Sequence, residues 1–201
     1  MSIARRAAFV ALLTAGLAPV AVAQSPLTRL RGTIVAADSN MLSLATHGGE
    51  TLKVALTTKT AVTAVVPAQL SEIRKGSFIG TAALPGPKGT LIALEVHVFP
   101  ESMRGTGEGY RPFDLRPEST MTNGTVGSVV VSSGRTLTVR YKGGEKTVTV
   151  PDGIPVVALQ PGDRTLLVAG AHAILFAAKQ ADGDLAAIRV LVGKNGLVPP
   201  M

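Results

Sequence analysis

The sequence predicts an all-β protein made of two tandem, small OB-like β-barrels behind an N-terminal signal peptide. Three observations predict this fold. Short β-branched runs alternate apolar and polar residues and are separated by glycine turns, which is typical of strands. The order of these runs and turns occurs twice along the chain. The chain of 201 residues is long enough for two small domains, and its 46% hydrophobic content can supply their cores.

The two copies begin with the same pattern. The tripeptide that starts at Gly32 reads GTI, and the one that starts at Gly124 reads GTV. Both copies continue with a strand-like run, two adjacent glycines that predict a hairpin turn with positive φ, and a second strand-like run. Both close on a G-x-L strand, at 89–98 and at 183–192. Because these features keep their order, we predict a duplication, and we expect each copy to form one five-stranded barrel.

This interpretation divides the chain into consecutive parts. They are a signal peptide (1–23), a lead-in (24–30), a first barrel (31–99), a central connecting segment rich in glycine, arginine and acids (100–123), a second barrel (124–193) and a C-terminal tail (194–201). One short helix is expected at 67–73, where Pro67 suits a first turn and two apolar residues lie three apart.

The first residues have the three-part order of a secretory signal. Arg5 and Arg6 precede an apolar run at 7–18, and Ala-Val-Ala at 21–23 is typical of a cleavage site. The apolar run is too short to span a bilayer, and no later stretch reaches that length. We therefore predict cleavage after Ala23 and a periplasmic or secreted protein with no transmembrane span. The alternative is an uncleaved N-terminal helix.

Composition limits the partners. The chain contains no cysteine, which excludes disulfides, thiolate metal sites and cysteine nucleophiles. The net charge is +7, and removal of Arg5 and Arg6 with the leader leaves +5. Aromatic residues make up only 3%, too few for the stacking platforms of single-strand nucleic-acid binders. We expect no nucleic-acid partner, and we consider an envelope protein or an anionic polymer as the partner.

The glycine and strand pattern resembles that of a known group. A G-T-[IV] start, a G-G turn, [KP]-G-[SD] before a strand and a closing G-x-L strand resemble secreted bacterial domains of unknown function with OB-like barrels. The two-copy arrangement joined by a stretch such as 100–115 is also similar to small exported proteobacterial proteins, some labelled as metal transporter permeases. The resemblance implies a periplasmic location. The chain departs from a permease because it has no apolar span after the leader.

No motif in the sequence marks a catalytic site. The chain has no G-x-S-x-G nucleophile motif and no metalloprotease H-E-x-x-H. Paired carboxylates for glycoside cleavage would have to come from the acids at 101–118. Those acids are interspersed with arginines, so ion pairs are the simpler expectation. We therefore predict a protein that is not an enzyme, without catalytic residues and without a cofactor other than a possible divalent metal.

One pair of side chains has the chemistry of a metal site. Strand alternation over 91–98 places Glu95 and His97 on the same face, side by side. A carboxylate and an imidazole two residues apart can supply two ligands to a zinc- or copper-like ion. The alternative is an exposed strand face without a ligand. The matching residues of the second copy are Arg189 and Leu191, so the barrel itself does not need His97.

The central segment at 100–123 is expected to be neither strand nor helix, because it lacks apolar periodicity. It interleaves apolar side chains with arginines and acids, unlike a flexible spacer, so we expect it to be ordered and docked. The segment begins beside the face that carries Glu95 and His97. We predict that these two residues form a polar cluster at the junction of the barrels with Glu101, Arg104, Glu108, Arg111 and Asp114. The alternative is an ion-paired structural clasp.

The sequence as a whole predicts an exported, non-enzymatic β-barrel module of the cell envelope that binds or interacts with a partner. The alternative is a small periplasmic metal-binding or metal-handling protein that uses Glu95, His97 and carboxylates of the central segment.

Overall fold

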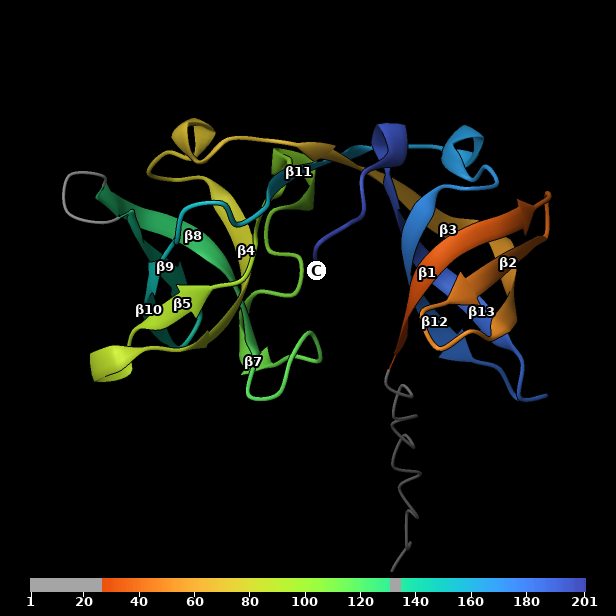
Figure 1. Cartoon of the computed structure of the whole chain (residues 1–201), viewed down its shortest axis with the longest axis horizontal. Helices are drawn as coiled ribbons and strands as arrows, with labels where there is room; N and C mark the ends of the chain where they lie inside the picture. The colour runs from red at the N-terminus through yellow and green to blue at the C-terminus, as the bar shows by residue number, and fades with distance from the viewer. Residues whose placement is uncertain (1–26, 131–134) are drawn as a thin grey trace, which may run out of the picture.

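The computed structural model describes residues 27–130 and 135–201, and this part of the chain is all-β (Figure 1). Its strands pair into one continuous network, accompanied only by single-turn 3-10 helices. The predicted signal peptide at 1–23 lies outside the described residues. In the described part, no helix is long and apolar enough to cross a membrane.

Five strands close into a first barrel, called barrel A. They are β1 (Thr28–Ala37), β2 (Met41–Thr46), β3 (Thr51–Pro67), β12 (His172–Lys179) and β13 (Leu185–Gly193). Neighbours are antiparallel except β3 and β13, which run parallel. The closed order is β1-β2-β3-β13-β12 and back to β1. Closure pairs every strand on both sides, which removes exposed sheet edges.

Five other strands close into barrel B in the same way. They are β4 (Phe78–Pro85), β5 (Leu91–Ala93), β8 (Thr120–Val130), β9 (Thr136–Tyr141) and β10 (Gly144–Thr149). The order is β8-β9-β10-β5-β4 and back to β8, again with one parallel pair, β5 and β10. The predicted all-β fold with small five-stranded barrels is therefore confirmed.

The predicted division into one barrel at 31–99 and another at 124–193 is wrong. Barrel A takes β1, β2 and β3 from the first range but β12 and β13 from the second. Barrel B takes β4 and β5 from the first range and β8, β9 and β10 from the second. The physical reason is β3, a strand of 17 residues that does not turn back into its own barrel but leads the chain across to the other.

The two crossings of the chain pair with each other. The second half of β3 is antiparallel to β11 (Val156–Pro161), with Val65 opposite Leu159 at the centre of the pairing. In Figure 1 these strands run across the upper part of the molecule between the barrels. β11 is also parallel to β6 (Val96–Val98), which in turn pairs with β4. These contacts join the barrels into one sheet network.

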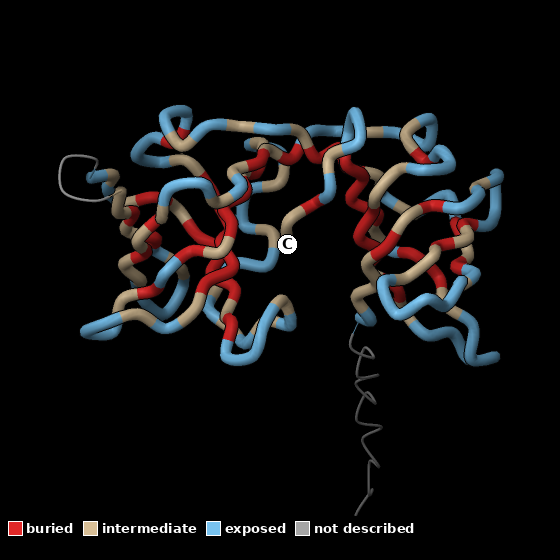
Figure 2. The backbone as a smooth tube through the Cα atoms, in the orientation of Figure 1, coloured by how far each residue is buried: buried red, intermediate tan, exposed pale blue. Residues whose placement is uncertain are grey.

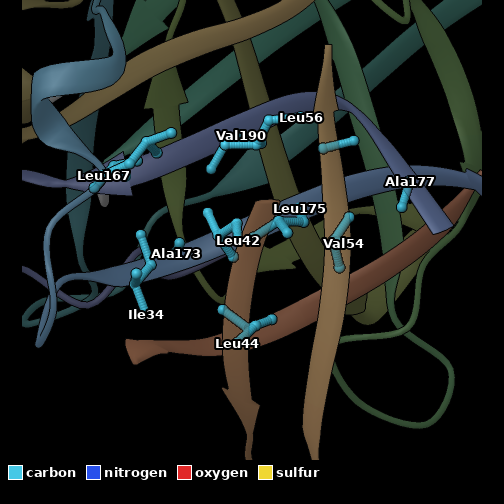
Figure 3. Close-up of a cluster of buried hydrophobic side chains, with 12 residues drawn as sticks. Ile34, Leu42, Leu44, Val54, Leu56, Leu167, Ala173, Leu175, Ala177 and Val190 are labelled. Carbon is cyan, nitrogen blue, oxygen red and sulfur yellow. The ribbon is translucent and has the colours of Figure 1, made fainter. Parts of the chain in front are cut away.

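The described residues form three apolar cores. One fills barrel A, where side chains from β1, β2, β3, β12 and β13 meet (Figure 3). A second fills barrel B. The third lies at the junction of the barrels and includes Val65, Phe99, Leu159 and Leu191. Figure 2 shows buried residues in both barrels and along the strands between them. The junction is therefore a packed core and not a loose linker.

The central segment is more regular than expected. It contains the 3-10 turn η3 (Glu101–Met103), the strand β7 (Gly109–Pro112) and the start of β8, so the prediction that it holds no strand is wrong. β7 adds to the sheet beside β8, because backbone pairing needs no apolar periodicity. The expected docking is confirmed, since Met103 and Phe113 pack on the junction core.

The remaining turns are short. The helix expected at 67–73 is only the 3-10 turn η1 (Leu70–Glu72), because Pro67 is the last residue of β3. Single 3-10 turns also follow β4, β11 and β13: η2 (Pro87–Gly89), η4 (Arg164–Leu166) and η5 (Lys194–Gly196). The tail does not project into solvent. It runs back between the barrels, where Met201 is buried (Figure 1).

If each barrel needs strands from both halves, cutting the central segment will not separate them. We expect a variant with a protease site inserted between Gly105 and Thr106 to be cut there, because Gly105 is exposed. The two fragments should then elute together at the mass of the whole chain in size-exclusion chromatography. Fragments that separate without denaturant as two folded barrels would contradict the exchange of strands.

Two glycines at matching places allow close strand approach. A Cβ atom on Gly32 would lie 2.0 Å from the carbonyl oxygen of Ala45, and one on Gly124 would lie 2.3 Å from that of Arg140. We expect Gly32→Ala and Gly124→Ala each to lower the free energy of unfolding by about 2 kcal/mol, since the backbone must move. The matched control is Gly48→Ala, which has no close backbone neighbour. Denaturant unfolding measures all three, and equal losses would contradict the packing.

Candidate functional site

Glu95 and His97 lie at a step between two short strands. Leu91, Ala93 and Val96 all point into the core of barrel B. The first two are two residues apart, as in a regular strand, but the next is three residues further on. Alternation is therefore shifted by one residue at this step, and Glu95 lies between β5 and β6. His97 then points away from the barrel core, toward the junction, where it contacts the ring of Phe99 at 4.9 Å between centroids.

The predicted contact between these two residues is present, but they are not on an exposed face. Glu95 is 0% exposed and His97 is 4% exposed. His97 Nδ1 lies 3.0 Å from Glu95 Oε2, and Glu95 Oε1 accepts a hydrogen bond of 2.7 Å from the backbone N–H of Ala82. Both carboxylate oxygens are thus used within the chain. Donation from Nδ1–H to the carboxylate leaves Nε2 of His97 as the available nitrogen.

Glycine in the middle of β4 makes room for the imidazole. A Cβ atom on Gly80 would lie 2.2 Å from His97 Nε2 and 2.5 Å from Asn123 Oδ1, so no larger residue fits. Asn123 donates from Nδ2 to the carbonyl oxygen of Thr106, while its Oδ1 is buried without a hydrogen-bond partner. An isolated glycine inside a strand pattern is a sequence signal of close approach, and it could have marked this place.

A cavity of about 280 Å³ lies at the junction of the barrels, next to His97 and Asn123. We call it the junction cavity. Both barrels, β11, the central segment and the tail contribute to its walls. The walls are mainly apolar and aromatic, and they include Phe99, Met121, Leu159, Leu191 and Met201, with Phe113 and Phe176 near Arg29.

Three arginines also line the junction cavity: Arg29, Arg111 and Arg189. Within residues 27–130 and 135–201, no aspartate or glutamate lines it. The guanidinium of Arg29 lies 4.3 Å from the ring centroid of Phe113 and 5.4 Å from that of Phe176. Its Nε is buried without a hydrogen-bond partner. The cavity therefore combines apolar walls with positive charge.

The arginines differ in how far the chain neutralises them. Arg29 and Arg31 share one carboxylate, Asp114, whose pKa is lowered by the hydrogen bond from Arg31 and by both positive charges. Arg111 donates 2.6 Å to the carbonyl oxygen of Gly107 and has no ion pair in the described part of the chain. Burial, and then the charge of Arg29, lower the pKa of Arg111. The side chain of Arg189 has no hydrogen bond or ion pair with any described residue.

The polar cluster predicted from the central segment does not form as one cluster. Arg104 pairs with Glu101 and reaches the carbonyl oxygen of Gly76 at 2.9 Å. Glu108 accepts from the backbone N–H of Lys142, and Asp114 faces the arginines of β1. Only Arg111 lines the same cavity as His97. Of the five residues of the central segment only Arg111 lies in β7, which pairs with β8. Glu101 lies in η3, and Arg104, Glu108 and Asp114 lie in the turns around these elements, so each side chain meets a different part of the molecule.

The Glu95 and His97 pair supplies only two candidate metal ligands. Among residues 27–130 and 135–201, no group of three or more His, Asp and Glu side chains could hold a metal ion. The carboxylates of the central segment that were expected to join the pair are turned elsewhere. Any metal at this place would need ligands from outside these groups, such as water.

No protein-family model, curated protein or solved structure matches the chain. The resemblance to secreted domains of unknown function therefore stays a prediction. The residues that sequence reasoning did not select are Arg29 and Asn123, which come from different barrels and meet only through the crossing of the chain. Arg189 was noted only as the counterpart of Glu95.

The buried Glu95 carboxylate should matter more to stability than exposed acids. We expect Glu95→Ala to lower the free energy of unfolding by about 3 kcal/mol, because Ala82 N–H and His97 would lose their partner in the interior. The control is Glu101→Ala, whose exposed pair with Arg104 should be worth less than about 1 kcal/mol. Equal losses in urea unfolding would contradict the structural role of Glu95.

Proposed function

We propose that this protein is a non-enzymatic binding module of the cell envelope that holds a small, mostly apolar molecule in the junction cavity. The observation that carries this proposal is a cavity of about 280 Å³ with walls from both barrels. Its size is close to the lower end of small-molecule sites, which begins at about 300 Å³. Mainly apolar walls with a few polar groups are typical of such sites.

The cavity is open on one side. Its inner walls are buried side chains such as Phe99, Leu159 and Leu191, whereas Leu27 and Ile188, which also line it, are about half exposed. A small molecule could therefore enter from solvent and bury apolar surface against the inner walls. This favours a binding role for the cavity.

The polar groups favour binding over catalysis. His97 has a carboxylate partner, as in catalytic triads, but its Nε2 is held close to Gly80 and Asn123. Nucleophilic catalysis of the triad type needs a serine or threonine hydroxyl at Nε2. Glu95 is also engaged by a backbone N–H, which suits a fixed structural acceptor. Export to the periplasm, predicted from residues 1–23, remains part of the proposal.

Metal handling is the second candidate function. The hydrogen bond of 3.0 Å between His97 Nδ1 and Glu95 favours it, because a carboxylate on one ring nitrogen orients an imidazole that binds a metal through the other. It is weaker than the first because both Glu95 oxygens are already used within the chain, which leaves Nε2 of His97 as the available ligand. Titration of the purified protein with zinc and copper, followed by calorimetry, separates the two candidates: binding at micromolar concentration that is lost in His97→Ala would favour the metal.

The test of the proposed function uses a neutral apolar probe, N-phenyl-1-naphthylamine, whose fluorescence rises in apolar surroundings. We expect saturable binding to the folded protein at a single site. Leu191→Trp should abolish it, because the larger ring fills the cavity that Leu191 lines. The control is Ile92→Trp, at a partly exposed position outside the cavity, which should bind as the unmodified chain does.

Absence of saturable binding to the unmodified chain would contradict the proposed function. Unchanged binding by a folded Leu191→Trp variant would contradict the assignment to the junction cavity. Circular dichroism of each variant establishes that it is folded.

A further inference from the structure

We infer that the molecule bound in the junction cavity is an anion, namely an apolar compound that carries one carboxylate. The inference rests on the proposed function and names its ligand class. It follows from a surplus of positive charge at a cavity whose walls are otherwise apolar.

Arg111 is a charged residue of the cavity wall without an ion pair among the described residues. Its guanidinium is held beside Gly107, to whose carbonyl oxygen it donates, and both residues line the cavity. The chain supplies it with no carboxylate in the described part. A half-buried charge without a counter-ion is unfavourable, and the lowered pKa of Arg111 reflects this burial and the nearby Arg29. An anion in the cavity would provide the missing charge.

Arg189 and Glu95 are equivalent positions of the two halves. Each residue directly precedes a stretch that runs parallel to a crossing strand: β13 continues beside β3, and β6 lies beside β11. The two crossing strands pair with each other, so these positions correspond. A shift in the pairing of β13 with β3 lies between Ala187 and Arg189, like the step before Glu95. The Glu95 side chain is buried and used, whereas the Arg189 side chain faces the cavity without a partner among the described residues.

Arg29 also lines the cavity. Its guanidinium lies near the rings of Phe113 and Phe176, which limits its movement. It shares Asp114 with Arg31, which also donates from Nε to the main-chain oxygen of Met201 at 2.9 Å. The positive charge left at the cavity is therefore that of Arg111 and Arg189, which have no ion pair among the described residues. Glu95, which does not line the cavity, is held by Ala82 and His97. The local balance therefore remains positive, and arginine is the residue best suited to a planar carboxylate.

The apolar walls exclude a ligand that is only an ion. Phe99, Leu191 and Met201 would gain nothing from a hydrated phosphate, whereas a hydrocarbon chain or ring would bury against them. At roughly 30 Å³ for each water-sized group, about 280 Å³ gives room for on the order of ten such groups. A medium-chain or aromatic monocarboxylate has this size.

The test compares octanoate, octanol and octylamine as competitors of N-phenyl-1-naphthylamine at neutral pH. The three share one chain and differ in the charge of the end group. We expect octanoate to displace the probe at a concentration about tenfold lower than octanol, with octylamine the weakest, because charge-assisted hydrogen bonds form only with the anion. Inorganic phosphate should not displace the probe.

Arginine variants locate the effect. Arg111→Met and Arg189→Met should each reduce the preference for octanoate over octanol by about fivefold or more, while binding of the neutral probe persists. Arg111→Lys, which keeps the charge, should retain most of the preference. The matched control is Arg140→Met, whose guanidinium pairs with Glu145 at an exposed place and does not line the cavity.

Each outcome separates the two claims. Equal competition by octanoate and octanol, with the probe bound, would overturn the anion inference and leave the proposed function standing. Competition by phosphate as strong as by octanoate would overturn the apolar part of the ligand. Failure of the probe to bind the unmodified chain would contradict the proposed function, and the inference with it. If Arg111→Met does not fold, Arg189→Met and Arg111→Lys decide.

Discussion

The antiparallel pairing of β3 with β11 is the constraint on which the rest of the structure depends. β3 leads the chain out of barrel A to β4 and β5, which belong to barrel B. β11 leads it back from barrel B to β12 and β13, which complete barrel A. Val65 and Leu159 are buried at the centre of this pairing. Neither of these two strands can separate from the other without the loss of backbone hydrogen bonds and apolar contacts for both. Two barrels of ordinary size are thereby joined into one cooperative unit.

The same crossing creates the candidate site. β6 beside β11 carries His97, and β13 beside β3 carries Leu191, so the strands bring these two residues to the walls of one cavity. The matching places of the two halves hold different chemistry: a buried acid at Glu95, and at Arg189 a cation without an ion pair among the described residues. At this one pair of matching places, the first half gives the cavity a hydrogen-bonded histidine beside Glu95, and the second half gives it the positive charge of Arg189.

Sequence reasoning reached the fold class and several local features. Turn glycines and alternating runs predicted an all-β protein with small five-stranded barrels, although not which strands form each barrel. The contact of Glu95 with His97 followed from their spacing. The exchange of strands was not predictable. β12 and β4 have similar apolar patterns, and the local sequence pattern of β1 does not determine which of the two it pairs with. The cavity was missed for the same reason. Arg29 and Arg111 are far apart in the sequence, and only the exchanged topology brings them to one wall.

The exchanged fold requires that β1 pairs with β12 and not with β4. Because the chain has no cysteine, paired cysteine substitutions test it directly. Thr33 lies opposite His172, with 3.1 Å between Oγ1 and Nδ1, whereas in self-contained barrels Thr33 would take the place that Thr125 has opposite Phe78. Oxidation should give a monomeric disulfide in Thr33→Cys/His172→Cys and none in Thr33→Cys/Phe78→Cys, as read by mass spectrometry. The reverse result would contradict the exchanged fold and the junction cavity built on it.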